Sequence, residues 1–148
     1  MTGWDAFAAG LADELSTAPD TSVIVIGEAV PAASWRFVQF RKDEGALWAE
    51  LTADRWLEPG SCPDEAGRAA ISRAGWHPPD GVDTFNRWVE FAWPVTTGNY
   101  RQAAAMAVAG LRDGFGIAKP DDLSYEAWVE RSGNHRLLLP SLGVREKT

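Results

Sequence analysis

The sequence is poor in the residues that carry metal and nucleophile chemistry. It has one cysteine, Cys62, and two histidines, His77 and His135. A single thiol cannot form an intramolecular disulfide, and no second thiol is present to help complete a zinc site. Cys62 near a helix start has the placement of a reactive thiol, but a partly buried structural residue is the simpler interpretation. We therefore expect no disulfide, no metal, no cofactor and no catalytic residue of these types.

Long apolar runs are missing too. The longest, such as Val23 to Ile26, are far too short to cross a bilayer. The sequence opens Met-Thr-Gly-Trp-Asp, without a basic or an apolar leader segment. We expect neither a signal peptide nor a membrane anchor. The lone cysteine favours a reducing compartment, so the expected location is the cytoplasm.

Clusters of basic residues are absent. The net charge is −7, and the densest basic group, Arg36, Arg41 and Lys42, is followed directly by Asp43 and Glu44. Proteins that bind nucleic acid gain much of their affinity from cations that neutralise phosphates, so we expect no nucleic-acid partner. The same balance argues against anionic membrane surfaces, and it favours basic partners.

Hydrophobic periodicity predicts one α+β domain. A hairpin turn at 43–45 joins two of the predicted strands, which makes the sheet antiparallel, and no Gly-rich turn indicates a dinucleotide-binding fold. We predict a sheet of about four to five strands with helices packed on it, in the order α-β-β-β-α-β-(β)-α. The domain is expected over residues 1–140, with a flexible tail over 141–148. Helices are predicted over 4–15, from a cap at Ser61 to Gly75, and from Asn99 to Phe115; strands are predicted over 22–26, 35–43, 46–54 and 85–93.

Tryptophan is abundant, with eight residues in 148. The triplet Trp-x-Glu begins at Trp48, Trp88 and Trp128, each copy forty positions after the last. The first two copies fall on predicted strands, whereas the third lies in SYEAWVER, which has helical character. Repeat proteins reuse one supersecondary unit, so the spacing does not indicate an internal repeat.

Glu50 and Glu90 are the best acid and base candidates. If their strands are neighbours, both carboxylates lie on one face, and each lies two residues from a tryptophan. A pair of carboxylates buried close together raises the pKa of one of them, and glycosidases use such a pair as acid and base. The alternative is that both glutamates simply occupy the wetter face of the sheet.

A binding surface fits the composition better. Apolar area rimmed by charge marks interaction sites on soluble proteins, although a covering helix is the alternative that the sequence leaves open. The predicted peptide-binding residues are Val38, Phe40, Trp48, Glu50, Trp88 and Glu90.

Several segments together resemble a known family, the actinobacterial YbjN-like, type III secretion chaperone-like domains called TY-Chap. The resemblance spans nearly the whole chain except the tail, and it is carried by FVQF (37–40), LWAEL (47–51), AGWHPPD (74–80), NRWVEFAWP (86–94) and residues 104–128. It implies a helix, three antiparallel strands, a helix, one or two strands and a helix. It also implies binding of extended polypeptide without catalysis, in a homodimer. Secretion-chaperone folds have two strands between the second and third helices; here only 85–93 is clear, and 136–139 is the candidate for the other.

The leading hypothesis is therefore a non-enzymatic domain that binds a peptide or protein client. Two alternatives stay open. One is an immunity protein that neutralises a basic toxin through complementary charge. The other is a small-molecule enzyme that uses Glu50 and Glu90.

Overall fold

The fold is a two-layer α+β domain, as predicted. The computed structural model describes residues 3–30 and 34–147. The sheet order is β4-β3-β2-β1-β5-β6, with β7 also beside β5, so the sheet has more strands than the four to five expected. Neighbouring strands are antiparallel except for β5 and β7. The main elements are α1 (Gly3–Thr17), β1 (Ser22–Glu28), β2 (Phe37–Asp43), β3 (Ala46–Leu51), α2 (Glu65–Ala74), β4 (Arg87–Phe91), α3 (Thr97–Val108), β5 (Leu123–Val129), β6 (His135–Arg136) and β7 (Arg145–Glu146).

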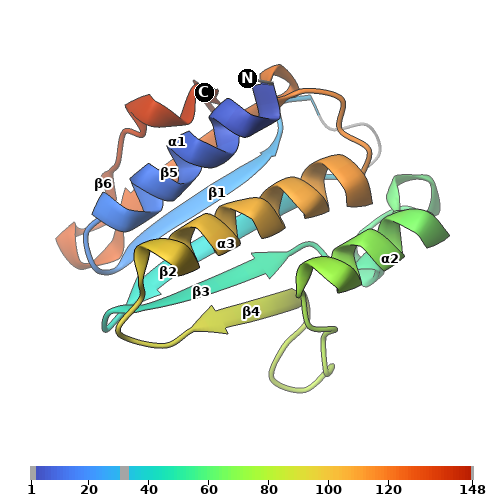
Figure 1. Cartoon of the computed structure of the whole chain (residues 1–148), viewed down its shortest axis with the longest axis horizontal. Helices are drawn as coiled ribbons and strands as arrows, with labels where there is room; N and C mark the ends of the chain where they lie inside the picture. Colours follow the sequence, from blue (N-terminus) through green and yellow to red (C-terminus); the bar gives the residue numbers. More distant parts are fainter. Residues whose placement is uncertain (1–2, 31–33, 148) are drawn as a thin grey trace.

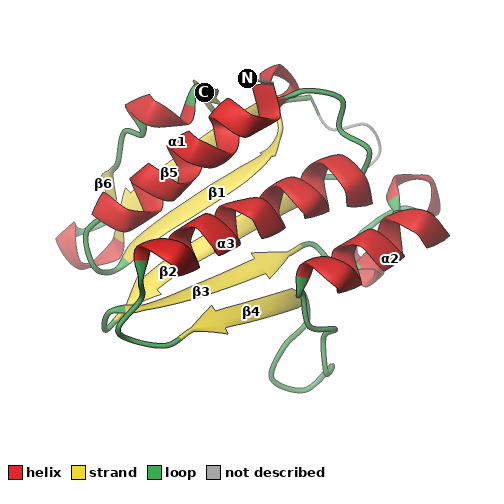
Figure 2. Ribbon diagram, in the orientation of Figure 1, coloured by secondary structure: helices red, strands yellow, loops and turns green. Residues whose placement is uncertain are grey.

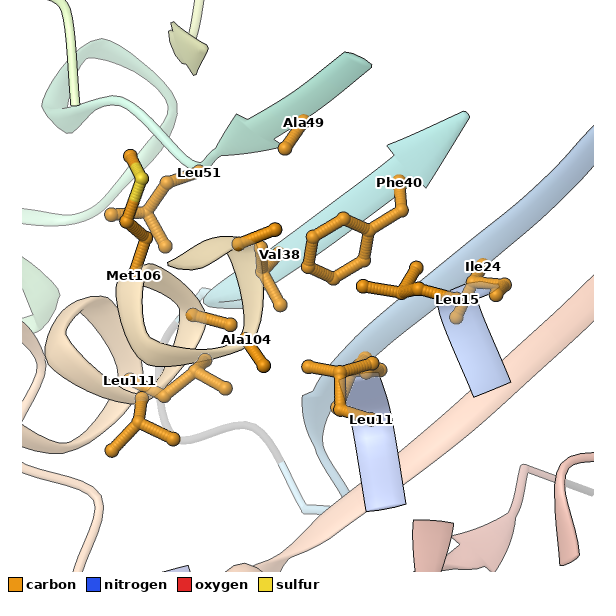
Figure 3. Close-up of a cluster of buried hydrophobic side chains, with 14 of the residues drawn as sticks. Leu11, Leu15, Ile24, Val38, Phe40, Ala49, Leu51, Ala104, Met106 and Leu111 are labelled. Atoms are coloured by element: carbon orange, nitrogen blue, oxygen red, sulfur yellow. The ribbon is translucent and has the colours of Figure 1, made fainter. Parts of the chain in front are cut away.

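All three α-helices lie on the same face of the sheet (Figures 1 and 2). Because successive strand residues point to opposite faces, every second side chain of a strand points towards the helices. The core forms there (Figure 3), from Leu11, Leu15, Ile24, Val38, Phe40, Ala49, Leu51, Ala104, Met106 and Leu111. Burying each large apolar side chain contributes about 1.5–3 kcal/mol. The opposite face, here called the open face, has no α-helix on it over the described residues.

The β2–β3 hairpin sets which residues reach the open face. Glu44 and Gly45 both have positive φ, at 53° and 79°, as a tight two-residue hairpin turn requires. The turn pairs Phe40 with Ala49 and Arg41 with Trp48. Residues directly across a ladder share a face, so Trp48 lies on the open face beside Arg41, while Phe40 lies in the core.

Two helix starts differ from the predicted ones. Asp64, not Ser61, caps α2, since its carboxylate accepts the Gly67 amide at 2.7 Å. Cys62 therefore precedes the helix rather than lying in its first turn. Thr96 caps α3 in a reciprocal pair of hydrogen bonds with Asn99, both at 3.1 Å, so this helix begins earlier than predicted.

The segment SYEAWVER was predicted to be helical, and this is wrong. Residues 123–129 form β5, which pairs with β1 along its whole length. Leu123, Tyr125 and Ala127 belong to the core, so the strand alternates as a half-buried strand should. Trp128 consequently lies on the open face, together with Trp48 and Trp88, instead of in a separate context.

The end of the described chain is packed on the domain rather than forming the predicted flexible tail. The Ser141 amide donates to the Glu14 carboxylate of α1 at 2.7 Å, and Leu142 is 2% exposed. β7 pairs with β5. The domain therefore continues past residue 140 to 147. Only β4 lies between α2 and α3, and β6, the nearest match to the predicted 136–139 strand, pairs with β5 at the other side of the sheet.

Candidate functional site

The structure divides the six predicted site residues between the two faces of the sheet. Trp48 and Glu50 of β3 and Trp88 of β4 are partly exposed on the open face, and Glu90 beside them is exposed. Val38 and Phe40 are 0% and 1% exposed and belong to the core under the helices. The prediction that Val38 and Phe40 line the same surface is therefore wrong. The hairpin register places the neighbours of Val38 and Phe40, Gln39 and Arg41, there instead.

Trp48 and Trp88 stack on each other. Their ring centroids are 5.2 Å apart and their planes differ by 7°. The His77 ring lies against Trp88 with a centroid separation of 4.6 Å. His77 is held there by two backbone hydrogen bonds with Trp88, at 2.9 and 3.1 Å. The three rings form a continuous aromatic row along the β3–β4 side of the open face. Sequence patterns did not reveal the part played by His77, because it comes from a loop.

Glu50 orients Trp48 within this row. One carboxylate oxygen accepts the Trp48 indole N–H at 3.0 Å, and the other accepts the Asn86 amide at 3.2 Å. Asn86 in turn accepts the Ala53 amide at 3.0 Å. The indole of Trp48 is therefore fixed by hydrogen bonds as well as by stacking, which suits a preformed binding surface.

Glu50 and Glu90 share a face, as predicted, but they are not directly opposite each other. Glu50 faces Trp88 and Glu90 faces Trp48, so the two glutamates are diagonal neighbours. Diagonal pairs have α-carbons about 7–8 Å apart. Glu50 already accepts two hydrogen bonds, and Glu90 is exposed to solvent. The two carboxylates therefore do not form a directly opposed pair across the ladder.

A hollow of about 520 Å³ opens beside Trp48. Its lining includes Trp48 but not Trp88, and we infer from this that it opens on the side of the Trp48 ring away from the stacked partner. Its lining residues are Gln39, Arg41, Asp43, Glu44, Ala46, Trp48, Glu50 and Glu90. Aromatic surface and carboxylates therefore line one depression on the open face.

Side chains cover the middle of the open face. Arg41 of β2 pairs with Glu130, just after β5, at 2.9 Å, and β1 lies between these two strands. The ion pair therefore crosses β1, and Val23 of β1 is only 1% exposed. Farther along β1, a Cβ at Gly27 would lie 2.6 Å from the Trp35 ring, so Trp35 covers that end of the strand. A glycine after four β-branched residues is the sequence signal for this close approach.

A second hollow, of about 680 Å³, lies beyond this covered strip. It is lined by Glu126, Ala127, Trp128, Asn134, Arg136, Glu146 and Lys147. Arg136 pairs there with Glu146. Both of these depressions on the open face contain a tryptophan, and the one at Trp48 adjoins a second, stacked indole.

β4 is an edge strand of the sheet. The Trp88 N–H and C=O point away from β3, since both bond to His77. Backbone groups alternate in direction along an antiparallel strand, so the N–H and C=O of Glu90 also point outward. One side of β4 pairs with β3, and on its other side the single backbone partner among the described residues is His77. The edge beside Glu90 is therefore free to accept another strand.

Comparison with known families accounts for most of the chain. Residues 1–129 match the family TY-Chap3, described as T3SS (YopN, CesT) and YbjN peptide-binding chaperone 3. The chain belongs to this family. The TY-Chap3 match includes Trp48 and Trp88 and ends at the last residue of β5, so β6 and β7 lie outside it. The resemblance found in the sequence is confirmed. No curated protein and no solved structure matches the chain.

The described residues lack two further features. None of the helices described is long and apolar enough to cross a membrane. No group of three or more histidine, cysteine, aspartate or glutamate side chains is placed to hold a metal ion in residues 3–30 and 34–147.

Proposed function

We propose that this TY-Chap3 domain is a non-enzymatic, chaperone-like domain that holds an extended segment of a client protein on its open face. The stacked pair Trp48–Trp88 is the observation that carries the proposal. The two indoles are half-buried and stacked, and Glu50 fixes that of Trp48. They lie on a sheet face that carries no α-helix of the described residues, and together they present a rigid apolar surface. Rigid aromatic surface of this kind is typical of sites that grip another chain.

Binding combines two kinds of contact. The client's apolar side chains pack on the indole rings, and one further client side chain enters the hollow beside Trp48. Its backbone bonds to the outward N–H and C=O of Glu90 at the edge of β4, as an added strand does. Main-chain bonds tolerate many sequences, and the hollow beside Trp48 supplies selectivity. The client is a protein or peptide, and we propose that the encounter takes place in the cytoplasm.

The test uses Trp48→Ala and Trp88→Ala against a matched control, Trp93→Ala. Trp93 is 73% exposed and lines a different depression, with Lys42 and Tyr100. A labelled peptide selected from a random 12-residue library on the wild type is titrated by fluorescence anisotropy. Both site variants should weaken binding at least tenfold and keep the wild-type circular dichroism spectrum, while the control binds normally. Unfolding of both site variants would mean that the tryptophans serve the fold, and the proposal would fail.

An immunity protein is the second candidate, because exposed carboxylates gather at the Trp48 hollow. Such a protein binds a folded basic toxin rather than an extended segment. Its gene should neighbour a toxin gene, whereas the gene for a chaperone should neighbour a secreted client or a secretion component. Pull-down from the native cell with mass spectrometry distinguishes a toxin from an unfolded client.

We also propose that the domain forms a homodimer, as the family resemblance implies. Light scattering on the purified chain tests this. A monomer mass at high concentration would rule out the secretion-chaperone assembly, and peptide binding by a monomer would still support the open-face site.

A further inference from the structure

We propose that the segment held on the open face carries a lysine or arginine, whose cationic group lies on the free face of the Trp48 ring among the carboxylates of Asp43, Glu44 and Glu90. This inference rests on the proposed function and specifies the chemistry of the client. It follows from the free ring face of Trp48, from the charges around the hollow and from their existing partners.

One face of the Trp48 indole is available. Trp88 covers the other face at a centroid distance of 5.2 Å, and the hollow lies on the side away from Trp88. The indole N–H is already bonded to Glu50, so the ring cannot turn without losing that bond. The available contact is therefore the ring face, which attracts cations through its quadrupole.

The charges around this ring face are unbalanced. Arg41 is the only cationic residue that lines the hollow over the described residues, and it is paired with Glu130 at 2.9 Å. Glu50 accepts bonds from Trp48 and Asn86. Asp43, Glu44 and Glu90 are exposed, and none of them has an ion-pair partner over residues 3–30 and 34–147. A client cation would supply the missing charge.

The same protein shows this chemistry elsewhere. The Arg55 guanidinium lies 4.8 Å from the Trp56 ring and 5.3 Å from the Phe85 ring. Because Arg55 already lies over Trp56 and Phe85, those two rings do not need a cation from a client. At Trp48 the ring and the carboxylates are present, and no cation of residues 3–30 and 34–147 lies over the ring, since Arg41 is paired with Glu130.

A second copy of the chain fits this surface less well than a basic segment. Two open faces brought together about a twofold axis would place the same acidic rim on both sides of the contact. Like charges brought together at an interface oppose association. Complementary charge therefore selects a partner with a lysine or arginine between apolar residues.

The test begins with the random 12-residue library. Enrichment of lysine and arginine among the selected peptides supports the inference, and selection of peptides without basic residues overturns it. If no peptide binds the wild type at all, the proposed function itself fails. The tightest selected peptide is then remade with its basic residue replaced by norleucine and by glutamate.

Binding of these peptides is measured for the wild type, for Glu90→Gln and for the control Glu58→Gln. Both substitutions replace a glutamate by glutamine, so they change the net charge equally. Glu58 is exposed and does not line the hollow, so its substitution controls for that charge change alone. The wild type should prefer the basic peptide over its norleucine form by about 5- to 20-fold, as a cation–π contact with nearby carboxylates allows. Glu90→Gln should reduce this preference about threefold or more and leave norleucine binding unchanged, and Glu58→Gln should change neither.

Added salt supplies an independent readout. Raising NaCl from 0.05 to 0.5 M, concentrations chosen to bracket about a threefold change in Debye length, should weaken the basic peptide and spare the norleucine peptide. Equal affinity for the basic and norleucine peptides would overturn the cation site while leaving the peptide-binding proposal standing.

Discussion

Trp48 and Trp88 stack across the β3–β4 ladder although neither is directly opposite the other. Each tryptophan faces a glutamate, in the pairs Trp48–Glu90 and Glu50–Trp88, and the two rings meet along the diagonal of this square. Large aromatic side chains can reach a diagonal neighbour, whereas smaller ones cannot. The alternation of indole and carboxylate gives the surface both its apolar area and its acidic rim.

The stacking should be measurable as a coupling free energy. We expect Trp48→Ala and Trp88→Ala to be non-additive in urea unfolding, with a coupling of about 0.5–1.5 kcal/mol, the usual worth of an aromatic pair beyond buried area. The pair Trp48→Ala and Trp93→Ala serves as the control and should be additive. Additivity in both cycles would show that the stack contributes nothing of its own to stability.

Glu44 occupies a left-handed backbone position for which its side chain is poorly suited. Its φ is 53°, and it precedes Gly45 in the hairpin turn. Asn adopts this conformation more readily than Glu, so Glu44→Asn should stabilise the domain by about 0.5–1 kcal/mol. Gly45→Ala should do the opposite, because φ is +79° and the new Cβ would lie 2.4 Å from the Trp93 ring. Thermal and urea unfolding of the two variants would show opposite shifts.

The chain after Pro140 should contribute to stability. Leu142 is 2% exposed in the core, so Leu142→Ala should cost about 2–4 kcal/mol. Leu138 is 55% exposed, and Leu138→Ala is the matched control, with an expected change below about 0.5 kcal/mol. Equal urea midpoints for the two variants would show that the segment is only loosely attached.

Lys42 of β2 caps the C-terminal end of α1, which packs on the same face of the sheet. Its buried ammonium donates to the backbone carbonyls of Leu15 and Ala18, both at 2.8 Å. Lys42→Met leaves those two carbonyls without this donor, and we expect a loss of about 1–3 kcal/mol. Desolvation lowers the pKa of Lys42, and the nearby Asp20 opposes this only in part.

The direction of the pH dependence follows from that shift. At alkaline pH, between the lowered pKa of the folded state and the ordinary pKa of the unfolded chain, the unfolded state binds more protons. Stability therefore rises with pH across this window. The difference in unfolding free energy between wild type and Lys42→Met should grow from neutral pH to alkaline pH. A difference that shrinks instead would show that burial does not disfavour the charged form.

Asp80 organises the loop between His77 and β4, and His77 packs against Trp88 at the base of this loop. Its carboxylate accepts the amides of Val82, Asp83 and Thr84 at 2.7–2.9 Å, and these bonds, that of Thr84 first, lower the pKa of Asp80. The stabilisation is present above the ordinary aspartate pKa and is lost as pH falls through the lowered value. Asp80→Ala should speed proteolysis within residues 78–85 at neutral pH. Asp83 is exposed, so the Asp83→Ala variant is the control and should be cleaved at the wild-type rate.

Local patterns predicted most of the first part of the fold. The apolar stripe of α1, the β-branched run of β1 and the Glu44–Gly45 turn each have one favourable local conformation, and the structure contains all three. Alternation also placed Trp48, Glu50, Trp88 and Glu90 on one face. The helix starts were displaced by a few residues, because several polar residues in each segment are able to cap and only the packed helix selects one.

Two errors arose where contacts distant in sequence decide the outcome. SYEAWVER has residues that suit a helix, but pairing with β1 on one side and with β6 and β7 on the other makes it a strand. Val38 and Phe40 were grouped with Trp48 because alternation gives two faces without saying which face of one strand joins which face of the next. The hairpin register settles that choice.

The sequence by itself determined the α+β class, the acidic charge and the surplus of tryptophan, because composition and periodicity are properties of the chain alone. Its local segments, such as LWAEL and NRWVEFAWP, carried the resemblance to the family. Only the tertiary structure decided that the helices all pack on one face and leave the Trp48–Trp88 pair uncovered on the other. It alone brought His77 against Trp88 and placed Asp43, Glu44 and Glu90 beside Trp48, where none of them has an ion-pair partner in the described part of the chain. Those relations depend on strand order and register, which long-range pairing sets and a local pattern does not contain.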